Sequence, residues 1–161
     1  MSFQSLDRWY STAIMSGQFN LDRFVQAQDP ILAQVEQELH DGRKRSHWMW
    51  FVFPQFRGLG HSAMARHYAI ASMAEARAYL LHPVLGPRLA GCTALVNTVT
   101  DRSSVEIFGS PDDRKFHSSM TLFSLADPDA MVFRQALEKY FDSEPDRLTA
   151  ELVERRETNP D

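Results

Sequence analysis

Cations, a histidine and aromatic rings are crowded into one short stretch of this sequence. It reads Gly42-Arg43-Lys44-Arg45-Ser46-His47-Trp48-Met49-Trp50-Phe51-Val52-Phe53-Pro54-Gln55. Guanidinium groups fork onto phosphate oxygens and an indole ring stacks on a base, so the combination suits an anionic ligand that also carries a ring, such as a nucleotide or an ADP-ribose-like molecule. An alternative needs no ligand. Arg43 and Lys44 would offset the dipole at a helix C-terminus, and the tryptophans would fill the core.

A second polar cluster begins at Asp112. Lys115 precedes Ser118 and Ser119 by three and four residues, and side chains at these spacings share one helix face. A lysine that reaches a hydroxyl is typical of phosphate binding or of an activated nucleophile. The alternative is a solvated face with routine capping, in which Asp112 and Asp113 occupy the favourable first turn of a helix.

If the two clusters meet in space, they predict one ligand pocket. Its candidate lining residues are Arg43, Arg45, His47, Trp50, Gln55, Lys115 and Ser119. Polar groups are costly to bury unless they are paired or used, and their density in an apolar stretch is the reason for expecting a pocket. The ligand would be a small phosphorylated or nucleotide-like molecule, held by a binding domain or by an enzyme. In an enzyme, a buried His47 beside cations is the candidate catalytic acid or base.

No metal site or resident cofactor is expected. No two histidines stand at i, i+4 with a carboxylate partner, and Cys92 is the single thiol. The sequence also lacks a Walker A loop, a dinucleotide-binding glycine fingerprint and a nucleophile elbow. Cys92 lies in an apolar helical stretch and is expected to be a buried, inert thiol.

Length and composition indicate one globular domain. The chain has 161 residues and 43% apolar residues, which is ordinary for a soluble protein. Its formal net charge of −4 argues against a surface built for nucleic acid. No window approaches the roughly 18–20 apolar residues of a membrane span, and no secretory signal is recognisable. We therefore expect a cytoplasmic protein, with which a single cysteine is consistent.

Helix-start signals recur along the chain and predict an all-α fold. Residues that can cap a helix are followed by apolar residues at helical spacing. The capping candidates are Asn20, Asp29 before Pro30, Ser46, Ser62, Ser72, Ser103, Asp127 before Pro128, and Asp146. Gly42 is expected to end one of these helices in the left-handed conformation.

The segment from Trp48 to Pro54 has no charged side chain and must be buried on all sides. A strand would suit its composition, but no neighbouring run could pair with it, so a helix is favoured. We predict a single multihelical domain of about seven or eight helices, packed around a short buried central helix at about residues 46–54. The domain should span residues 20–153, between a loosely attached or disordered leader (1–19) and a polar tail (154–161).

The stretch from Gly42 to Gln55 resembles the signature of a bacterial family catalogued as domain of unknown function 1810. Further similarities are Leu59-Gly60, Tyr68 with Ile70, Tyr79-Leu80, His82-Pro83-Val84-Leu85-Gly86, Ile107-Phe108-Gly109, Asp113 with Lys115, and Ser118-Ser119-Met120-Thr121-Leu122-Phe123. The resemblance spans about Phe19 to Val153 and implies a mostly helical domain around a central buried helix. It implies no activity and therefore no catalytic residue.

Two other functions stay open. One is a protein-interaction module without catalysis, in which the leader and an acidic face contact a partner that the sequence does not name. The other is weak nucleic-acid binding through Arg43–Arg45. Three adjacent cations in a net-acidic domain make a small electrostatic footprint, so nucleic acid is the less favoured partner.

Overall fold

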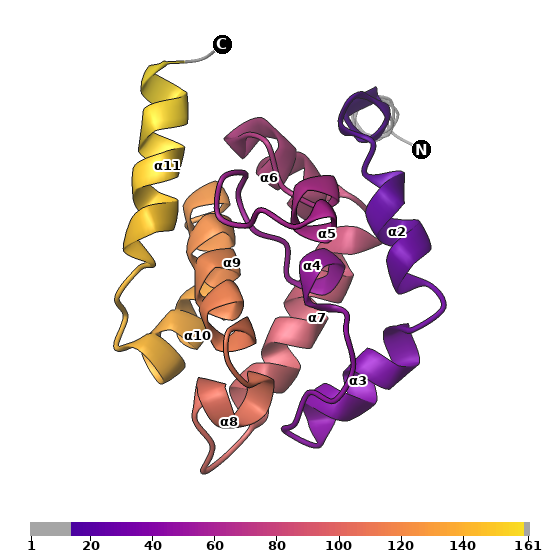
Figure 1. Cartoon of the computed structure of the whole chain (residues 1–161), viewed down its shortest axis with the longest axis vertical. Helices are drawn as coiled ribbons and strands as arrows, with labels where there is room; N and C mark the ends of the chain where they lie inside the picture. The colour runs from indigo at the N-terminus through magenta and orange to yellow at the C-terminus, as the bar shows by residue number, and fades with distance from the viewer. Residues whose placement is uncertain (1–13, 160–161) are drawn as a thin grey trace, which may run out of the picture.

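The computed structural model describes residues 14–159 and consists of helices joined by short loops (Figure 1). After a helical segment at 14–19, the helices are α2 (Asp22–Gln28), α3 (Leu32–His40), α4 (Met49–Val52), α5 (Ala63–His67), α6 (Met73–Leu81), α7 (Leu85–Thr98), α8 (Ser104–Phe108), α9 (Asp112–Ala126), α10 (Met131–Phe141) and α11 (Arg147–Thr158). Within the described residues β pairing is limited to a parallel bridge between Phe56 and Ile70. The predicted all-α class is therefore confirmed.

The number of helices is higher than the predicted seven or eight. The excess comes from short elements, because α4 has 4 residues and α5 and α8 have 5 each. A helix this short is not stable alone and depends on the packing of its side chains.

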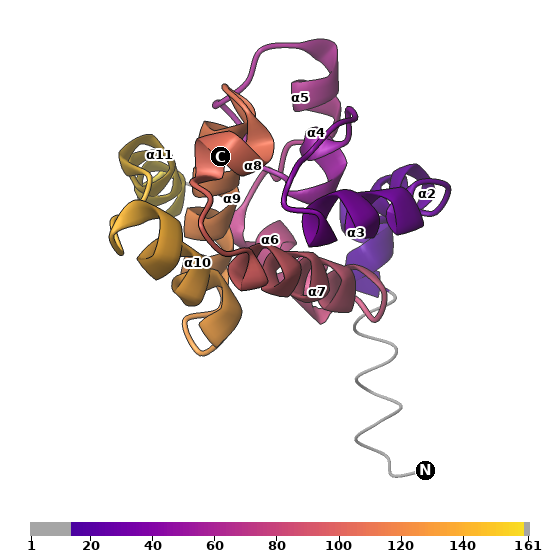
Figure 2. The same ribbon diagram turned by 90° about the horizontal axis from the view of Figure 1, so that it is seen from below.

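The two longest helices, α7 and α9, organise the packing. α9 contacts α4, α6, α8, α10 and α11, whereas α7 contacts α3, α6 and α10. Figure 2 shows α4 and α5 on one side of the molecule and α7 and α10 on the opposite side. Phe116, Met120 and Phe123 of α9 are fully buried, as a helix surrounded by neighbours requires.

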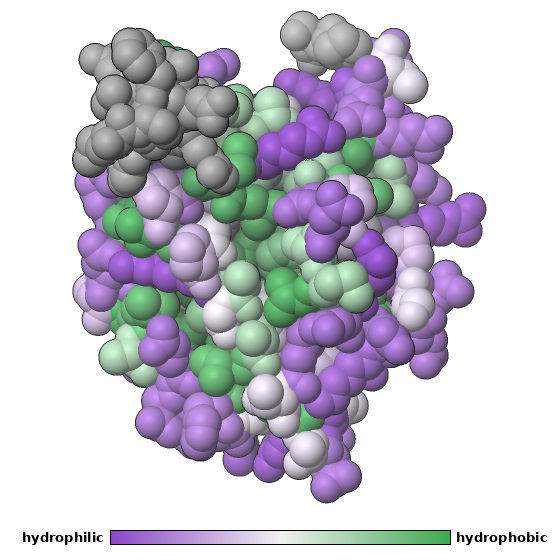
Figure 3. All heavy atoms as spheres, turned by 180° about the vertical axis from the view of Figure 1, so that it is seen from behind, coloured by the Kyte–Doolittle hydropathy of each residue, from purple (hydrophilic) through white to green (hydrophobic). Residues whose placement is uncertain are grey.

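The surface seen from behind is partly apolar. Figure 3 shows apolar residues gathered near the middle of this face, with hydrophilic residues around them.

The backbone before α4 is folded around Glu38 of α3. The hydroxyl and the N–H of Ser46 donate to its carboxylate at 2.5 and 2.8 Å, Trp48 Nε1 donates at 3.3 Å, and the Arg45 N–H donates as well. Because the Ser46 hydroxyl donates to Glu38, it does not cap a helix. The helix expected at about 46–54 is therefore the single turn Met49–Val52, which starts after Trp48.

The aromatic residue that follows α4 ties this turn to the helices behind it. Phe53 is fully buried, and its ring packs edge-on against Phe108 of α8 and Phe116 of α9, with centroid distances of 5.9 and 5.1 Å. Such pairs add to the free energy of burying the rings themselves.

The expected leader is part of the packed body from residue 14 onward. Residues 14–19 are helical, and Met15 and Phe19 pack against the core. Asn20 has a φ of 51° and ends this segment, so it does not cap α2. Arg23 Nη1 then donates to the carbonyls of Phe19 and Asn20 at 2.7 and 2.8 Å. Residues 1–13 of the expected leader lie outside the described residues.

The expected polar tail is helical for most of its length. α11 begins after Asp146, whose carboxylate accepts the Thr149 N–H at 3.1 Å, as the capping prediction requires. The helix continues past 154 to Thr158, whose hydroxyl donates to the Glu154 carbonyl at 3.0 Å. Residues 160–161 lie outside the described part of the chain.

Candidate functional site

A cleft of about 480 Å³ opens between the loop before α5, the first turns of α9 and the start of α11. Ligand pockets commonly measure roughly 300–1,000 Å³, so the cleft has the size of a small-molecule site. Its polar lining residues are Gln55, His61, Ser62, Arg114, Lys115, Ser118 and Asp146. Its apolar lining residues include Leu59, Ala65, Pro111 and Leu148.

The loop from Gln55 to Ser62 is held in place by backbone hydrogen bonds. The Ile70 N–H donates to the Gln55 carbonyl at 2.9 Å, and the Arg57 N–H donates to the Ile70 carbonyl at 2.8 Å. Gly60 approaches Ala65 so closely that a Cβ added at Gly60 would lie 2.5 Å from the Ala65 side chain. The loop therefore packs against the start of α5 and forms one wall of the cleft.

Lys115 joins the two polar clusters of the sequence. Its Nζ lies 5.2 Å from the centroid of the Trp50 ring and 3.4 Å from Asp112 Oδ1. The other oxygen of Asp112 is 2.9 Å from Lys44 Nζ, whose side chain is nearly buried. The stretches 42–55 and 112–121 therefore meet in space, and Gln55 and Lys115 line the same cleft.

Three polar side chains of the cleft are free to bind a ligand. Gln55, His61 and Arg114 have no side-chain hydrogen bond or ion pair with any described residue. Gln55 offers a donor and an acceptor, and Arg114 offers the five N–H donors of a guanidinium. The loop before α5 and the first turns of α9 therefore present unused polar groups beside the Lys115 ammonium.

Asp146 belongs to the scaffold of the cleft. Its Oδ2 accepts from the Ser118 hydroxyl at 3.3 Å and from the Thr149 hydroxyl at 2.6 Å. Its N–H donates to Thr121 Oγ1 at 2.8 Å. These bonds fix the start of α11 against α9 and thereby set the width of the cleft. The Asp146 side chain already has its hydrogen-bond partners within the protein.

Part of the predicted binding set lies at this cleft. Gln55 and Lys115 line it, and Trp50 borders a smaller adjoining hollow that also contains Gln55. Ser119 is completely buried, and its hydroxyl has no hydrogen-bond partner among the described residues. Ser119 therefore lies behind the cleft wall, while its neighbour Ser118 reaches the lining.

The other predicted residues lie outside the cleft. The Arg45 guanidinium is 3.0 Å from the Asp41 carboxylate, and Arg43 and His47 are exposed. The chain turns around Glu38 at this point, which separates these three residues from the end of the stretch that carries Gln55. His47 was expected to be buried, but its side chain is exposed and does not line the cleft.

The sequence prediction missed Arg114, His61 and the structural contact of Asp146. Arg114 adjoins Lys115 in the chain, and that adjacency was the available signal. The capping role of Asp146 is local and was predicted, but its bond to Ser118 spans 28 positions and leaves no trace in a local pattern.

Other reactive groups outside the cleft have structural roles. His117 stacks on the Phe141 ring at 3.9 Å, and its Nε2 lies 2.7 Å from the Glu144 carbonyl. Cys92 is buried, as predicted, and burial raises the pKa of its thiol to about 12. Across residues 14–159 no group of three histidine, cysteine, aspartate or glutamate side chains is placed to hold a metal.

Comparisons with known proteins identify a family but no activity. The family model described as "Protein of unknown function (DUF1810)" matches residues 18–153. The crystal structure of the conserved hypothetical protein Rv1873 from Mycobacterium tuberculosis is similar, with 55% sequence identity and a TM-score of 0.84 over 85% of this chain and 98% of that one. A search of the curated proteins found no match. None of the described helices is long and apolar enough to cross a membrane. Since the family model covers most of the sequence, this chain belongs to the DUF1810 family of proteins of unknown function.

Proposed function

We propose that the cleft between α5, α9 and α11 binds a small phosphorylated, nucleotide-like molecule. The observation that carries this proposal is the position of the unpaired Arg114 beside Lys115 in a cleft of ligand size. Phosphate oxygens would accept hydrogen bonds from both cations. A base would pack against Leu59 and the half-exposed Leu148 on the apolar wall.

Trp50 acts through Lys115 in this proposal. A ring face attracts an ammonium group and holds it at the cleft wall. Asp112 interacts with Lys44 as well as with Lys115, so Lys115 has no dedicated carboxylate that would cancel its charge. Trp50 is thus a positioning residue, whereas the phosphate contacts come from Lys115 and Arg114.

Thermal-shift and calorimetric titrations with nucleoside monophosphates, ADP-ribose, NAD and sugar phosphates test the proposal. A ligand at about 100 times its Kd should raise the free energy of unfolding by about 2.7 kcal/mol. Lys115→Ala and Arg114→Ala should each weaken binding by about tenfold or more, because a hydrogen bond to a charged group contributes about 1.5–3 kcal/mol.

Arg43→Ala is the matched control, since it removes an exposed arginine that lies outside the cleft. It should leave binding unchanged. Binding that is lost in Arg43→Ala but kept in Arg114→Ala would overturn the proposed site. Failure of every compound to bind would overturn the proposed function.

Protein interaction without catalysis is a second candidate, favoured by exposed apolar side chains near the ends of α6 and α9. Leu81, Leu125 and Met131 are 56%, 41% and 55% exposed. Leu81 also lines a hollow of about 220 Å³ together with Arg77 and Asp127. An arginine and an aspartate beside one apolar hollow are self-complementary in a two-fold pair.

Sedimentation over a range of concentrations tests this second candidate. Self-association should disappear in Leu81→Glu and in Arg77→Asp. Adding Asp127→Arg to Arg77→Asp should restore it, because the charges are then exchanged. A chain that stays monomeric at every concentration would count against a self-complementary interface.

A further inference from the structure

A second hollow of about 220 Å³ lies between the loop at Arg57 and the last turns of α11. Arg57, Arg155 and Asn159 are among its polar lining residues, and Leu152 is part of its apolar lining. The side chains of Arg57 and Arg155 are exposed and have no ion pair or hydrogen bond with another described residue. Two arginines with unused donors therefore face one small depression.

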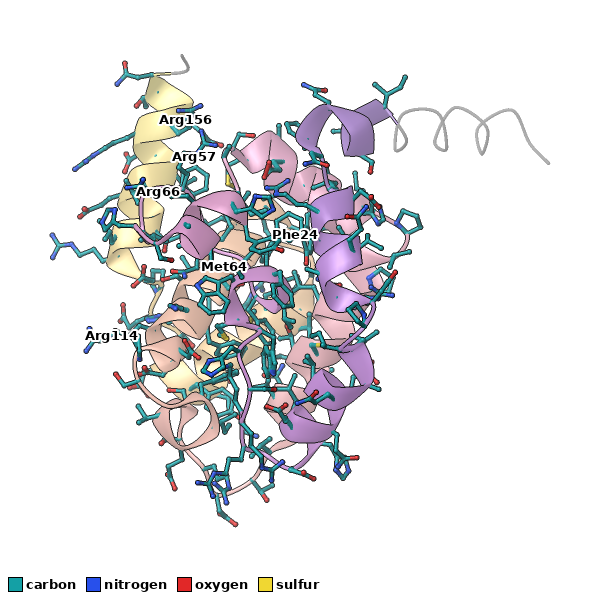
Figure 4. All side chains as sticks on the ribbon, turned by 45° about the vertical axis from the view of Figure 1, so that its right-hand side comes forward. Phe24, Arg57, Met64, Arg66, Arg114 and Arg156 are labelled. Atoms are coloured by element: carbon teal, nitrogen blue, oxygen red, sulfur yellow. The ribbon has the colours of Figure 1, made fainter. Side chains whose placement is uncertain are left out.

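Several arginines lie at or near this hollow, although the chain as a whole is acidic. Figure 4 shows Arg57, Arg66 and Arg156 close together on the same side of the molecule as Arg114. They come from the loop after Phe56, from α5 and from α11. Clustered arginines on one face attract an anion and can bind two of its oxygens at once.

The second hollow adjoins the main cleft. A Cβ placed at Gly58 would lie 3.5 Å from the Leu152 side chain, so the loop passes close to α11 at this point. Leu59 and Leu148 line the cleft, and Arg57 and Leu152, which lie close to them in the same loop and the same helix, line the hollow. Leu148 and Leu152 are one turn apart on a common helix face, which is a rise of about 5–6 Å. Gly58 and Leu152 therefore form an apolar saddle between the cleft and the hollow.

We infer that the second hollow is an anion subsite, and that the ligand of the cleft carries two separated phosphate groups, as a 5′-phosphorylated dinucleotide does. This inference rests on the proposed function. The terminal phosphate would bind Arg114 and Lys115, a nucleoside would cross the saddle, and the internal phosphodiester would bind Arg57 and Arg155.

Calorimetric titration with three probes tests the subsite: adenosine monophosphate, 5′-phosphorylated diadenylate, and diadenylate without the terminal phosphate. The 5′-phosphorylated dinucleotide should bind about tenfold tighter than the mononucleotide, because it gains charge-assisted hydrogen bonds. Removing the terminal phosphate from the dinucleotide should weaken its binding to the wild type. The same change should have little further effect in Arg114→Ala, because that variant has already lost the contact.

The double variant Arg57→Ala/Arg155→Ala should bind the dinucleotide no better than the mononucleotide, while its affinity for the mononucleotide stays unchanged. Arg43→Ala is again the control and should keep the full preference. If the mononucleotide binds through Lys115 but the dinucleotide binds no tighter, the subsite is overturned and the proposed function stands. A preference that persists in the double variant also overturns the subsite. If neither probe binds, both proposals fall.

Discussion

The side-chain hydroxyl and the backbone N–H of Ser46 both donate to the carboxylate of Glu38, at 2.5 and 2.8 Å. Glu38 is 2% exposed, so these bonds, with those from Arg45 and Trp48, replace the water that the carboxylate loses on burial. The segment with three adjacent cations, Arg43–Arg45, is thus shaped by an acidic residue on the preceding helix.

Glu38→Ala is expected to lower the free energy of unfolding by about 3 kcal/mol, because buried donors lose their acceptor. Urea unfolding followed by circular dichroism measures the loss. Glu36→Ala is the matched control, since Glu36 is exposed on the same helix. Equal stabilities for the two variants would show that the carboxylate does not hold the segment.

Stability should also depend on pH through Glu38. Burial raises the pKa of this carboxyl, but the hydrogen bonds from Ser46, Arg45 and Trp48 outweigh burial and leave the pKa below its ordinary value of 4.5. The unfolded chain therefore binds the proton more tightly, so the stabilisation is complete above pH 4.5 and is lost as the pH falls below it. The stability gap between the wild type and Glu38→Gln should narrow between about pH 6 and pH 3. A gap that stays constant would contradict this account.

A second pH dependence of stability, at a higher pH, is expected from His82. Its Nδ1 accepts the N–H groups of Val84 and Leu85 at 3.1 and 3.2 Å, which requires an unprotonated nitrogen. Burial lowers the pKa of His82 below its ordinary value of 6.5, so its contribution is present above that pH and declines as the pH falls below it. In His82→Asn the amide oxygen still accepts from the helix start but does not titrate. Melting temperatures from about pH 7.5 to pH 5 should fall more for the wild type than for this variant, and parallel curves would refute the assignment.

The role of Trp50 can be separated from that of Lys115 by a double-mutant cycle. Trp50→Leu should weaken ligand binding less than Lys115→Ala, because it removes the support of the ammonium and leaves the ammonium itself. Once Lys115 is alanine, Trp50→Leu should have little further effect on the Kd measured by calorimetry. Additive losses would show that Trp50 contacts the ligand directly.

Local capping chemistry was predictable from the sequence. Ser62, Ser72, Ser103 and Asp146 each accept a backbone N–H three residues ahead, as expected, and Gly42 has a φ of 71°. These contacts are fixed within one helical turn, so the pattern around each residue contains the needed information.

Four capping predictions were wrong. One is Asp127, which ends α9, whereas α10 begins after Ala130 without a side-chain cap. Asn20 adopts a φ of 51° and ends the segment at 14–19, while Asp29 ends α2 and pairs with Arg88 at 2.8 Å. Ser46 binds Glu38. In the last two cases the deciding partner lies 59 and 8 residues away, as the residue numbers show, beyond the reach of a capping pattern.

The candidate site could be predicted only in part. The chemistry of their side chains made Gln55, Trp50 and Lys115 candidates in the sequence. The structure brings the two stretches that carry them together, because both Lys44 and Lys115 interact with Asp112. The opposite wall comes from α11, and no sequence pattern indicates that this helix lies beside α9 at the cleft. Arg45 and His47 had similar chemistry, but the turn around Glu38 directs them away from it.

α11 lies at the edge of the molecule and packs mainly on α9 (Figure 1). A helix supported chiefly by one neighbour detaches at a lower free energy than the core does. A ligand bound to both Arg114 and Arg155 would have to leave before α11 could detach, so occupancy would slow amide hydrogen exchange in Arg147–Thr158 while exchange in α7 kept its rate. The mobility of the C-terminal helix would then report whether the cleft is filled.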